Sequence, residues 1–488
     1  MTITTELGAK SLASWLWRQL TSMRTALILL LLLGFAAIPG SIFPQRSQNP
    51  LKVSDYFKSN PGTAKFLDQL QMFDVYSSPW FSSIYILLFI SLIGCVLPRT
   101  FEHLKAARAK PTLTPKNLSR MEFHSENNFG SLDVAEAWFK KNRFRYRRDA
   151  NSISAEKGYS RETGNLVFHL SLILILVGVG VGSLYGMKGD AIINVGERFI
   201  NIPTSYDVIS FGKLQSEKTL NPFSVTATDF KATYELKTGA PSDYKLTVNI
   251  ADPVGSKEIS KVVRVNSPLT FGSTKVYLQA NGYSPLVTVR NKTGEIKYQG
   301  AVIFLPQDGN LTSIGAIKVP DMQPQVGFIG SFVPTFARNS ERGAFSSYPE
   351  VLDPRLLISI WTGDLGLDSG NPQSIYRLDT SAMERIGLKT LKLKESYNFG
   401  EGSITFEGWT PWVNLQIVKD PGKIYALLGS IFAILGLLLS LFTRSRRIWV
   451  KESASESGLE IAGLAKNSAP GLENEIAALV NEMRKTLR

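Results

Sequence analysis

Four long apolar runs limit what this chain can fold into. They occupy residues 26–42, 80–97, 167–184 and 424–442 of the 488-residue sequence. Each run is at or near the roughly 20 residues that a helix needs to cross about 30 Å of hydrocarbon. We therefore predict a membrane α-helical protein with four transmembrane helices.

The long segment between the third and fourth runs has a different pattern. Short stretches such as KVVRVN (261–266) and STKVYLQANGY (273–283) are rich in Val, Thr and Tyr, and Gly, Pro and Asn lie between them. This composition is typical of antiparallel β-strands joined by turns. The predicted fold class is four transmembrane helices plus a large β-rich extracytoplasmic domain.

The net charge of +13 indicates how the chain crosses the membrane. Ten of these 13 charges fall on residues 1–25, 99–163 and 443–488. Segments rich in Lys and Arg stay on the cytoplasmic side, so these three segments are predicted to be inside and the β-rich domain outside. The basic excess therefore marks topology and predicts no nucleic-acid partner. The densest basic stretch, KKNRFRYRRD at 140–149, fits charges that face solvent and anionic lipid headgroups, and the alternative is contact with heme propionates.

The sequence divides into nine predicted segments along the chain. They are a cytoplasmic interfacial helix (1–25), the first span (26–43), a short outer segment of one or two helices (44–79), the second span (80–98), a basic cytoplasmic loop domain (99–163), the third span (164–185), the β-rich domain (186–420), the fourth span (421–443), and a cytoplasmic tail with an amphipathic helix (444–488). The tail helix has an apolar stripe at Leu472, Ile476, Leu479, Met483 and Leu487. Such a stripe needs a surface to cover, either a partner protein or the inner loop.

Several functional classes are excluded by what the sequence lacks. It has no Walker A loop, no GxGxxG that follows a strand, no GxSxG and no HExxH. The spans lack the Asp, Glu and Lys of a proton-coupled transporter. The single cysteine, Cys95, lies in the second span, so the outer domain has no disulfide. We predict no independent enzyme and no catalytic residue.

His169 is the histidine that lies within a predicted span, about one turn inside the third. Its ring nitrogens need partners in lipid, and two interpretations remain open. One is a hydrogen bond to a neighbouring helix, for example through Ser171 or Ser91; the other is axial ligation of heme iron. His103 and His124 lie in the basic loop and are interpreted as surface or satisfied histidines. GVGVG at 178–182 is interpreted as a groove that lets another helix approach.

Four stretches and the His169 span together resemble the CcsB/ResB family of cytochrome c biogenesis proteins. The stretches are MRTALILLLLLGFAAIPGSIFPQ (23–45), SLIGCVLPR (91–99), VNSPLTFGSTKVYLQANGY (265–283) and KDPGKIYALLGSIFAILGLLLSLFTRSRRIW (419–449). They occur in the family's order over nearly the whole chain, and the long tail looks like the cyanobacterial and chloroplast branch. Residues 300–390 are the part that the resemblance constrains least.

The resemblance implies a subunit of the system II cytochrome c synthase in the thylakoid membrane, with the β-rich domain in the lumen. Such a subunit acts with a second membrane protein, CcsA (also called ResC), to deliver heme b and attach it to the CxxCH cysteines of apocytochromes c. His169 is then the candidate axial ligand of heme, and no other metal site is expected. Trp409 and Trp412 do not reproduce the partner's tryptophan-rich motif and are interpreted as a strand-end pair near the membrane. The alternative function is an assembly scaffold that holds apocytochrome and does not bind heme.

Overall fold

The computed structural model describes residues 9–48, 50–121, 123–341, 343–369, 373–453, 458–465 and 471–485. The chain forms two compact units: residues 1–180 with 422–488, and residues 181–421. We call them the helical unit and the β-rich unit. The chain therefore leaves the helical unit once, completes the β-rich unit, and returns.

Four helices of the described chain are long and apolar enough to cross a membrane. They are α2 (Met23–Ile42), α5 (Pro79–Arg108), α7 (Ser160–Tyr185) and α8 (Lys423–Phe442). Together with the extensive β-sheet of the β-rich unit, they confirm the predicted fold class. The second helix differs in length, because it continues past the predicted end at residue 98, through Pro98, to Arg108.

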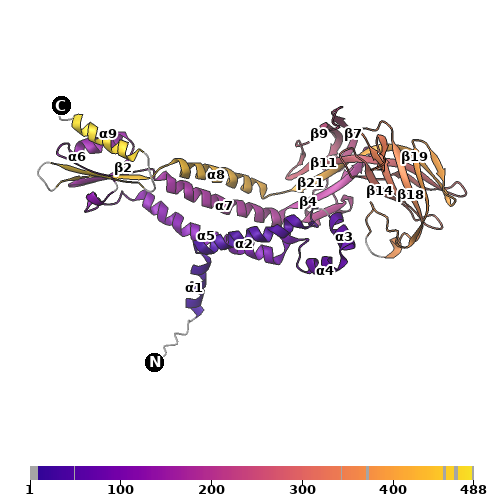
Figure 1. Ribbon diagram of the computed structural model, residues 1–488, viewed down its shortest axis with the longest axis horizontal. Coiled ribbons are helices and arrows are strands. Elements are labelled where there is room, and N and C mark those ends of the chain that lie inside the picture. Colours follow the sequence, from indigo (N-terminus) through magenta and orange to yellow (C-terminus); the bar gives the residue numbers. More distant parts are fainter. Residues whose placement is uncertain are drawn as a thin grey trace, which may run out of the picture. The chain divides into compact units, whose positions relative to one another are not determined.

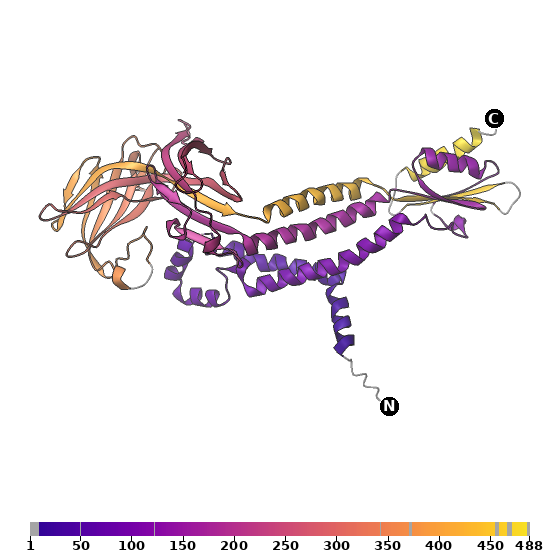
Figure 2. The same ribbon diagram turned by 180° about the vertical axis from the view of Figure 1, so that it is seen from behind.

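Helices α7 and α8 run side by side and pack closely through small residues (Figures 1 and 2). On α7, Gly164, Ser171 and Gly178 recur every seven residues and are all buried. A Cβ atom added to Gly436 of α8 would lie 2.6 Å from the Phe168 backbone nitrogen, and one added to Gly178 would lie 2.7 Å from that of Ala426. Without side chains at these positions the two backbones come into contact, which gives a membrane helix pair its dispersion energy.

The N-terminal part of the helical unit adds three shorter helices, α1 (Ala9–Leu20), α3 (Pro50–Ser59) and α4 (Pro61–Gln69). The last two are the helices expected in the segment 44–79. Gln45 is 3% exposed, and its side chain links the end of α2 to the turn after α4 by hydrogen bonds. Its amide donates to the carbonyls of Phe43 and Met72 at 3.0 and 2.9 Å, and its Oε1 accepts from the Val75 N–H at 3.0 Å. The last residue of the stretch IPGSIFPQ, Gln45, therefore has a structural role.

A five-stranded antiparallel sheet forms the other part of the helical unit, and we call it the loop–tail domain. Its strand order is β1-β23-β22-β3-β2. The basic loop supplies β1 (Phe123–Asn127), β2 (Arg145–Asp149), β3 (Ser152–Lys157) and α6 (Leu132–Lys141), whereas the tail supplies β22 (Arg446–Glu452), β23 (Leu459–Ala465) and α9 (Leu472–Lys485). Helices α6 and α9 cover one face of this sheet (Figure 1).

The apolar stripe of α9 packs inside the chain itself. Leu472, Leu479 and Met483 share one core with Phe139 of α6 and Ile461 of β23. Of the two surfaces considered for this helix, the inner loop is therefore the one it covers; Leu487 lies outside the described residues. The two tail strands were not predicted, because RRIWVKE and LEIAGLA are short, and each becomes stable only when paired with the other segment.

The described residues of the β-rich unit form four sheets, all antiparallel. A seven-stranded sheet follows the order β10-β11-β21-β4-β6, with β12 beside β11 and β20 beside β21. Its strands are β4 (Met187–Asn194), β6 (Val208–Phe211), β10 (Leu269–Phe271), β11 (Thr274–Asn291), β12 (Ile296–Ala301), β20 (Ser396–Asn398) and β21 (Gly402–Lys419). The five-stranded sheet has β13 (Leu305–Pro306), β14 (Ser313–Val319), β15 (Val326–Val333), β18 (Arg355–Gly363) and β19 (Met383–Lys392). The four-stranded sheet has β5 (Arg198–Ile200), β7 (Ser224–Tyr234), β8 (Pro241–Ala251) and β9 (Ile259–Arg264), and the smallest pairs β16 (Phe336–Asn339) with β17 (Gly343–Ser346).

Two hydrophobic cores share the long paired strands β11 and β21. The first core takes Val276 and Leu415 from these strands, and the second takes Val289 and Phe406. Between them Trp412 lies flat on Gly282, where an added Cβ would be 2.4 Å from the indole ring. Trp412 is 2% exposed and its indole donates to the Phe304 carbonyl at 3.0 Å. The interpretation of Trp409 and Trp412 as a strand-end pair is wrong, since both lie in the interior of β21.

Candidate functional site

His169 lies on α7, and the sequence around it favours a helix that starts at the loop–tail domain. Gly158 has a positive φ of 85° just before the helix, and Glu162 places negative charge in its first turn. Nine residues into the helix, the His169 side chain is half-buried. The imidazole is therefore held by a rigid element and remains partly accessible.

One hydrogen bond fixes the chemical form of this imidazole. His169 Nδ1 lies 2.7 Å from the backbone carbonyl oxygen of Asn165, one turn earlier. A carbonyl can only accept, so Nδ1 carries the proton, and in the neutral imidazole the Nε2 lone pair is then free. Within the described chain, Nε2 has no hydrogen-bond partner. A neutral imidazole with Nδ1–H bonded to a carbonyl is the usual form of a metal-ligating histidine, and the residue fits heme iron.

The two serines considered as alternative partners of His169 bond elsewhere. Ser171 Oγ donates to the Phe168 carbonyl at 2.6 Å, and Ser91 Oγ donates to the Leu20 carbonyl at 2.5 Å. His169 does form a hydrogen bond, but its acceptor lies on its own helix and not on a neighbouring one. This leaves the second ring nitrogen available.

His169 lies on the face of α7 opposite to α8. It precedes Ser171 of the α8-packing stripe by two residues, which turns it about 160° around the helix axis. Gly178, the first glycine of GVGVG, contacts α8 of the same chain, so this glycine does not serve another protein. Gly180 has open space around its Cβ position, and it is eleven residues, about three turns, after His169. The His169 side of α7 thus carries a glycine with open space beside it.

Helix α5 runs antiparallel to α7, and three hydrogen bonds set the register. His103 Nε2 of α5 is 3.0 Å from Thr163 Oγ1, and the Tyr159 hydroxyl donates to the His103 carbonyl at 3.3 Å. Further along, the Tyr85 hydroxyl donates to the Leu176 carbonyl at 2.6 Å. These contacts fix how α5 and α7 are aligned along their lengths, near both ends of the pair.

His103 is buried rather than exposed. It is 8% exposed, and its ring stacks on Tyr159 with centroids 4.8 Å apart and an interplanar angle of 11°. Its Nδ1 has no hydrogen bond and lies 3.6 Å from Glu162 Oε2. The expectation of a surface histidine is wrong for this residue, while the expectation of a satisfied one holds for Nε2. The ring packs the end of α5 against the first turn of α7.

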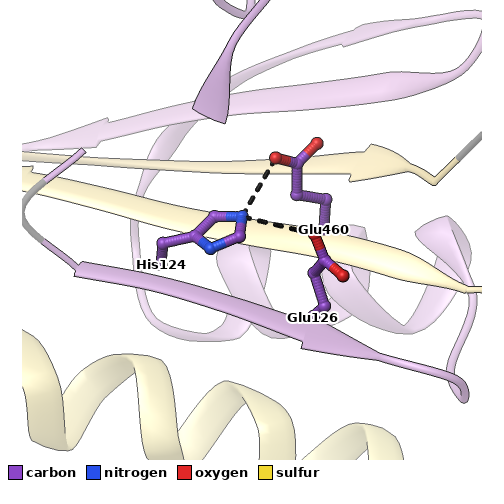
Figure 3. Close-up of side chains that lie close together, drawn as sticks. All are labelled: His124, Glu126 and Glu460. Atoms are coloured by element: carbon purple, nitrogen blue, oxygen red, sulfur yellow. Dashed lines mark hydrogen bonds and ion pairs between the residues drawn. The ribbon is translucent and has the colours of Figure 1, made fainter. Parts of the chain in front are cut away.

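His124 belongs to a separate group on the loop–tail sheet (Figure 3). Its Nε2 is 3.0 Å from Glu460 Oε1 and 4.0 Å from Glu126 Oε1. Glu126 and Glu460 stand directly opposite each other on β1 and β23, where like charges repel. These three side chains could offer ligand atoms to a metal ion. The strand pairing suggests a simpler role, in which the exposed imidazole of His124 lies near both carboxylates and reduces their repulsion.

Three arginines of the densest basic stretch pair with carboxylates of the loop–tail domain and not with His169. Arg145 is 3.6 Å from Glu156, Arg147 is 3.1 Å from Asp149, and Arg148 is 2.6 Å from Asp133. Exposed pairs of this kind add at most about 1 kcal/mol each, yet they occupy the guanidinium groups. Of the two interpretations of residues 140–149, the charged surface of a folded domain fits these contacts, and the one about heme propionates has no support from them.

Comparison with known proteins agrees with this architecture. The model of the ResB-like family matches residues 23–477. A protein of Prochlorococcus marinus named "Cytochrome c biogenesis protein CcsB" is 23% identical over 94% of this chain and 96% of its own length. Proteins with the same name from Synechococcus sp. (strain JA-3-3Ab) and Microcystis aeruginosa are 26% and 22% identical over 95% of this chain, and the match covers 89% and 94% of their lengths. The match includes all four apolar helices and both units, and the chain belongs to the ResB-like family.

Proposed function

We propose that this protein is a subunit of a cytochrome c synthase and takes part in c-type cytochrome biogenesis. Its role is to deliver heme b, as cargo, for covalent attachment to the CxxCH cysteines of apocytochromes c. The family and the names of the relatives support the general role. The observation that carries the heme step is the His169 imidazole, whose Nδ1–H is bonded to Asn165 and whose Nε2 is left free on α7.

A partner membrane protein of the CcsA/ResC type completes the proposed site. The His169 face of α7 supports this, because it is turned away from α8 and carries the open glycine Gly180. A close-packed partner helix at this face could supply the opposite ligand of heme iron. The attachment chemistry then belongs to the assembled pair, and this chain alone is not proposed to be an enzyme.

The proposed location is the thylakoid membrane, with the β-rich unit in the lumen. Cyanobacterial relatives and the basic charge on the loop–tail side of the helices support it. Membrane lipid then surrounds the exposed apolar side chains of α2 and α8, such as Phe35 (60% exposed) and Phe442 (82% exposed).

A scaffold that holds apocytochrome without binding heme is the second candidate. One observation favours it: residues 181–421 contain no cysteine and no histidine. This unit offers no thiol that could compete for the cysteines of an apocytochrome, and no imidazole for heme iron. In this version, all heme contacts lie on the partner.

The two candidates separate on the spectrum of the complex with its partner. We expect His169→Ala and His169→Gly to lose most of the bound heme, with a shifted Soret band and little matured cytochrome c. Added imidazole should restore the Soret band of His169→Gly, because it can occupy the vacated ligand position. His124→Ala is the matched control, since this histidine lies on the loop–tail sheet. Unchanged heme content and normal cytochrome maturation in both His169 variants would leave the scaffold as the function.

A further inference from the structure

The register of α5 and α7 determines which side chains flank His169. Counted from the contact between His103 and Thr163, His169 lies six residues along α7, or about 9 Å. Arg99 lies four residues back along α5, or about 6 Å, in the same direction. The two residues are therefore nearly level along the helix pair.

Helix geometry also puts Arg99 and His169 on the same side of this pair. At about 100° per residue, Arg99 and Cys95 are turned about 40° and 80° from the α7-facing direction marked by His103. Because the helices are antiparallel, this turn leads to the side on which His169 projects, away from α8. Arg99 also lies close enough to the Cys95 thiol to interact with it electrostatically.

Arg99 is an exposed cation that has no ion pair or hydrogen bond within the described chain. This distinguishes it from Arg145, Arg147 and Arg148, which all pair with carboxylates of the loop–tail domain. It also ends an apolar run, so its guanidinium is at the boundary of the hydrocarbon, where a charge interaction is stronger than in bulk water. Two acids of the same helix pair, Glu102 and Glu162, lie further from His169 toward the loop–tail domain.

We propose that Arg99 binds a propionate of the heme that His169 ligates. This inference rests on the proposed function and names the residue that orients the cargo. Heme carries both carboxylates on one edge, and the fork of a guanidinium matches a carboxylate with two parallel hydrogen bonds. A ligand to iron and a cation for the edge fix both the position and the rotation of the ring, which a single axial ligand cannot do.

The test uses the complex of the full chain with its partner, loaded with heme or with heme dimethyl ester, whose carboxylates are masked. We expect Arg99→Gln to lower heme retention on a desalting column roughly tenfold, the effect of about 1.4 kcal/mol, and Arg99→Lys to recover part of the loss. With the dimethyl ester, wild type and Arg99→Gln should retain equal amounts. Arg108→Gln is the matched control, because Arg108 is a cation of the same helix on the side away from α7.

Two outcomes for Arg99→Gln would contradict the proposed role of Arg99. If Arg99→Gln loses heme and dimethyl ester to the same extent, Arg99 acts as an anchor for lipid phosphates or for the fold, and the proposal is wrong. It is also wrong if Arg99→Gln retains as much heme as wild type. The His169 variants keep this failure separate from failure of the proposed function: loss of heme in His169→Ala, with no effect of Arg99→Gln, removes only the role of Arg99.

Discussion

The two units of this protein differ in the chemistry of their ionisable side chains. All three histidines lie in the helical unit, at an interhelical contact, on a sheet and on a membrane-spanning helix. The β-rich unit has none, and its most strongly shifted groups are buried tyrosines. Burial raises the pKa of Tyr234 to about 12, and it also raises the pKa values of Tyr206, Tyr283 and Tyr376. Imidazole and thiol side chains are therefore confined to one unit.

The units also differ in how the chain builds them. Residues 181–421 form the β-rich unit as one continuous segment, whereas the helical unit uses segments from both sides of it. The loop–tail sheet depends most on having both segments, since β22 from the tail lies between β23 of the tail and β3 of the loop. The β-rich unit is therefore built from one continuous segment, while the loop–tail sheet needs strands from both the loop and the tail.

The largest expected effect follows from truncation of the tail. A chain that ends at Ser445 lacks β22, β23 and α9, so β1 loses its neighbour and the core around Phe139 opens. We expect the remaining loop to be cleaved rapidly in limited proteolysis, while fragments of the β-rich unit persist. A chain that ends at Lys485 keeps α9 and serves as the control. A protected loop in the shorter chain would contradict the two-segment description.

The second prediction concerns alkaline pH and only the β-rich unit. A tyrosine has an unfolded pKa near 10 and Tyr234 has a folded pKa of about 12, so its contribution is complete below pH 10 and is lost as the pH rises to 12. The loss is about 3 kcal/mol, at 1.36 kcal/mol per pKa unit. Urea unfolding at a series of pH values, followed by fluorescence of the buried Trp412, should show it. Tyr234→Phe should flatten the curve, and an unchanged slope would assign the loss to other groups.

The third prediction tests the close approach of α7 and α8. Gly436→Val puts side-chain atoms where the Phe168 backbone lies 2.6 Å from a Cβ, and we expect a loss of roughly 1–3 kcal/mol in stability of the helical unit. Thermal melting in detergent measures it. Gly34→Ala is the control, because nothing lies within 4 Å of that Cβ position. If both variants melt alike, the two helices are not packed through their glycines.

The smallest effect is expected at the sheet histidine. His124→Ala leaves Glu126 and Glu460 opposite each other without the imidazole, which should cost roughly 0.2–1 kcal/mol in the loop–tail domain. Hydrogen exchange of β1 and β23 measures the change. Glu460→Gln in the same background should remove the repulsion and return exchange toward wild type. The outcome would be different if the group binds a metal ion. Added zinc would then stabilise wild type, and His124→Ala would show a large loss of stability.

Much of the architecture could be predicted from the residues. The four spans follow from the length and hydrophobicity of their runs, and the β-rich unit from the alternation of its strands and turns. A helix in the tail and its need for a surface were readable from the spacing of five apolar residues, from Leu472 to Leu487. The strands 446–452 and 459–465 were not, because their stability comes from partners about 300 residues away in the sequence. Trp412 was misread for the same reason, since nothing local distinguishes the end of a strand from the contact of two cores.

Sequence alone singled out His169, because a histidine in a run of apolar residues needs a partner. Only the tertiary structure determined which nitrogen has one: Nδ1 donates to Asn165, so Nε2 is free. Sequence likewise marked GVGVG as a place for close packing. The antiparallel register of α5 and α7 puts Arg99 and His169 at nearly the same level along the helix pair, and the contact of Gly178 with α8 shows that α8 lies on the opposite face. Local patterns fix which residues a helix carries, but direction in space depends on which helices it packs against.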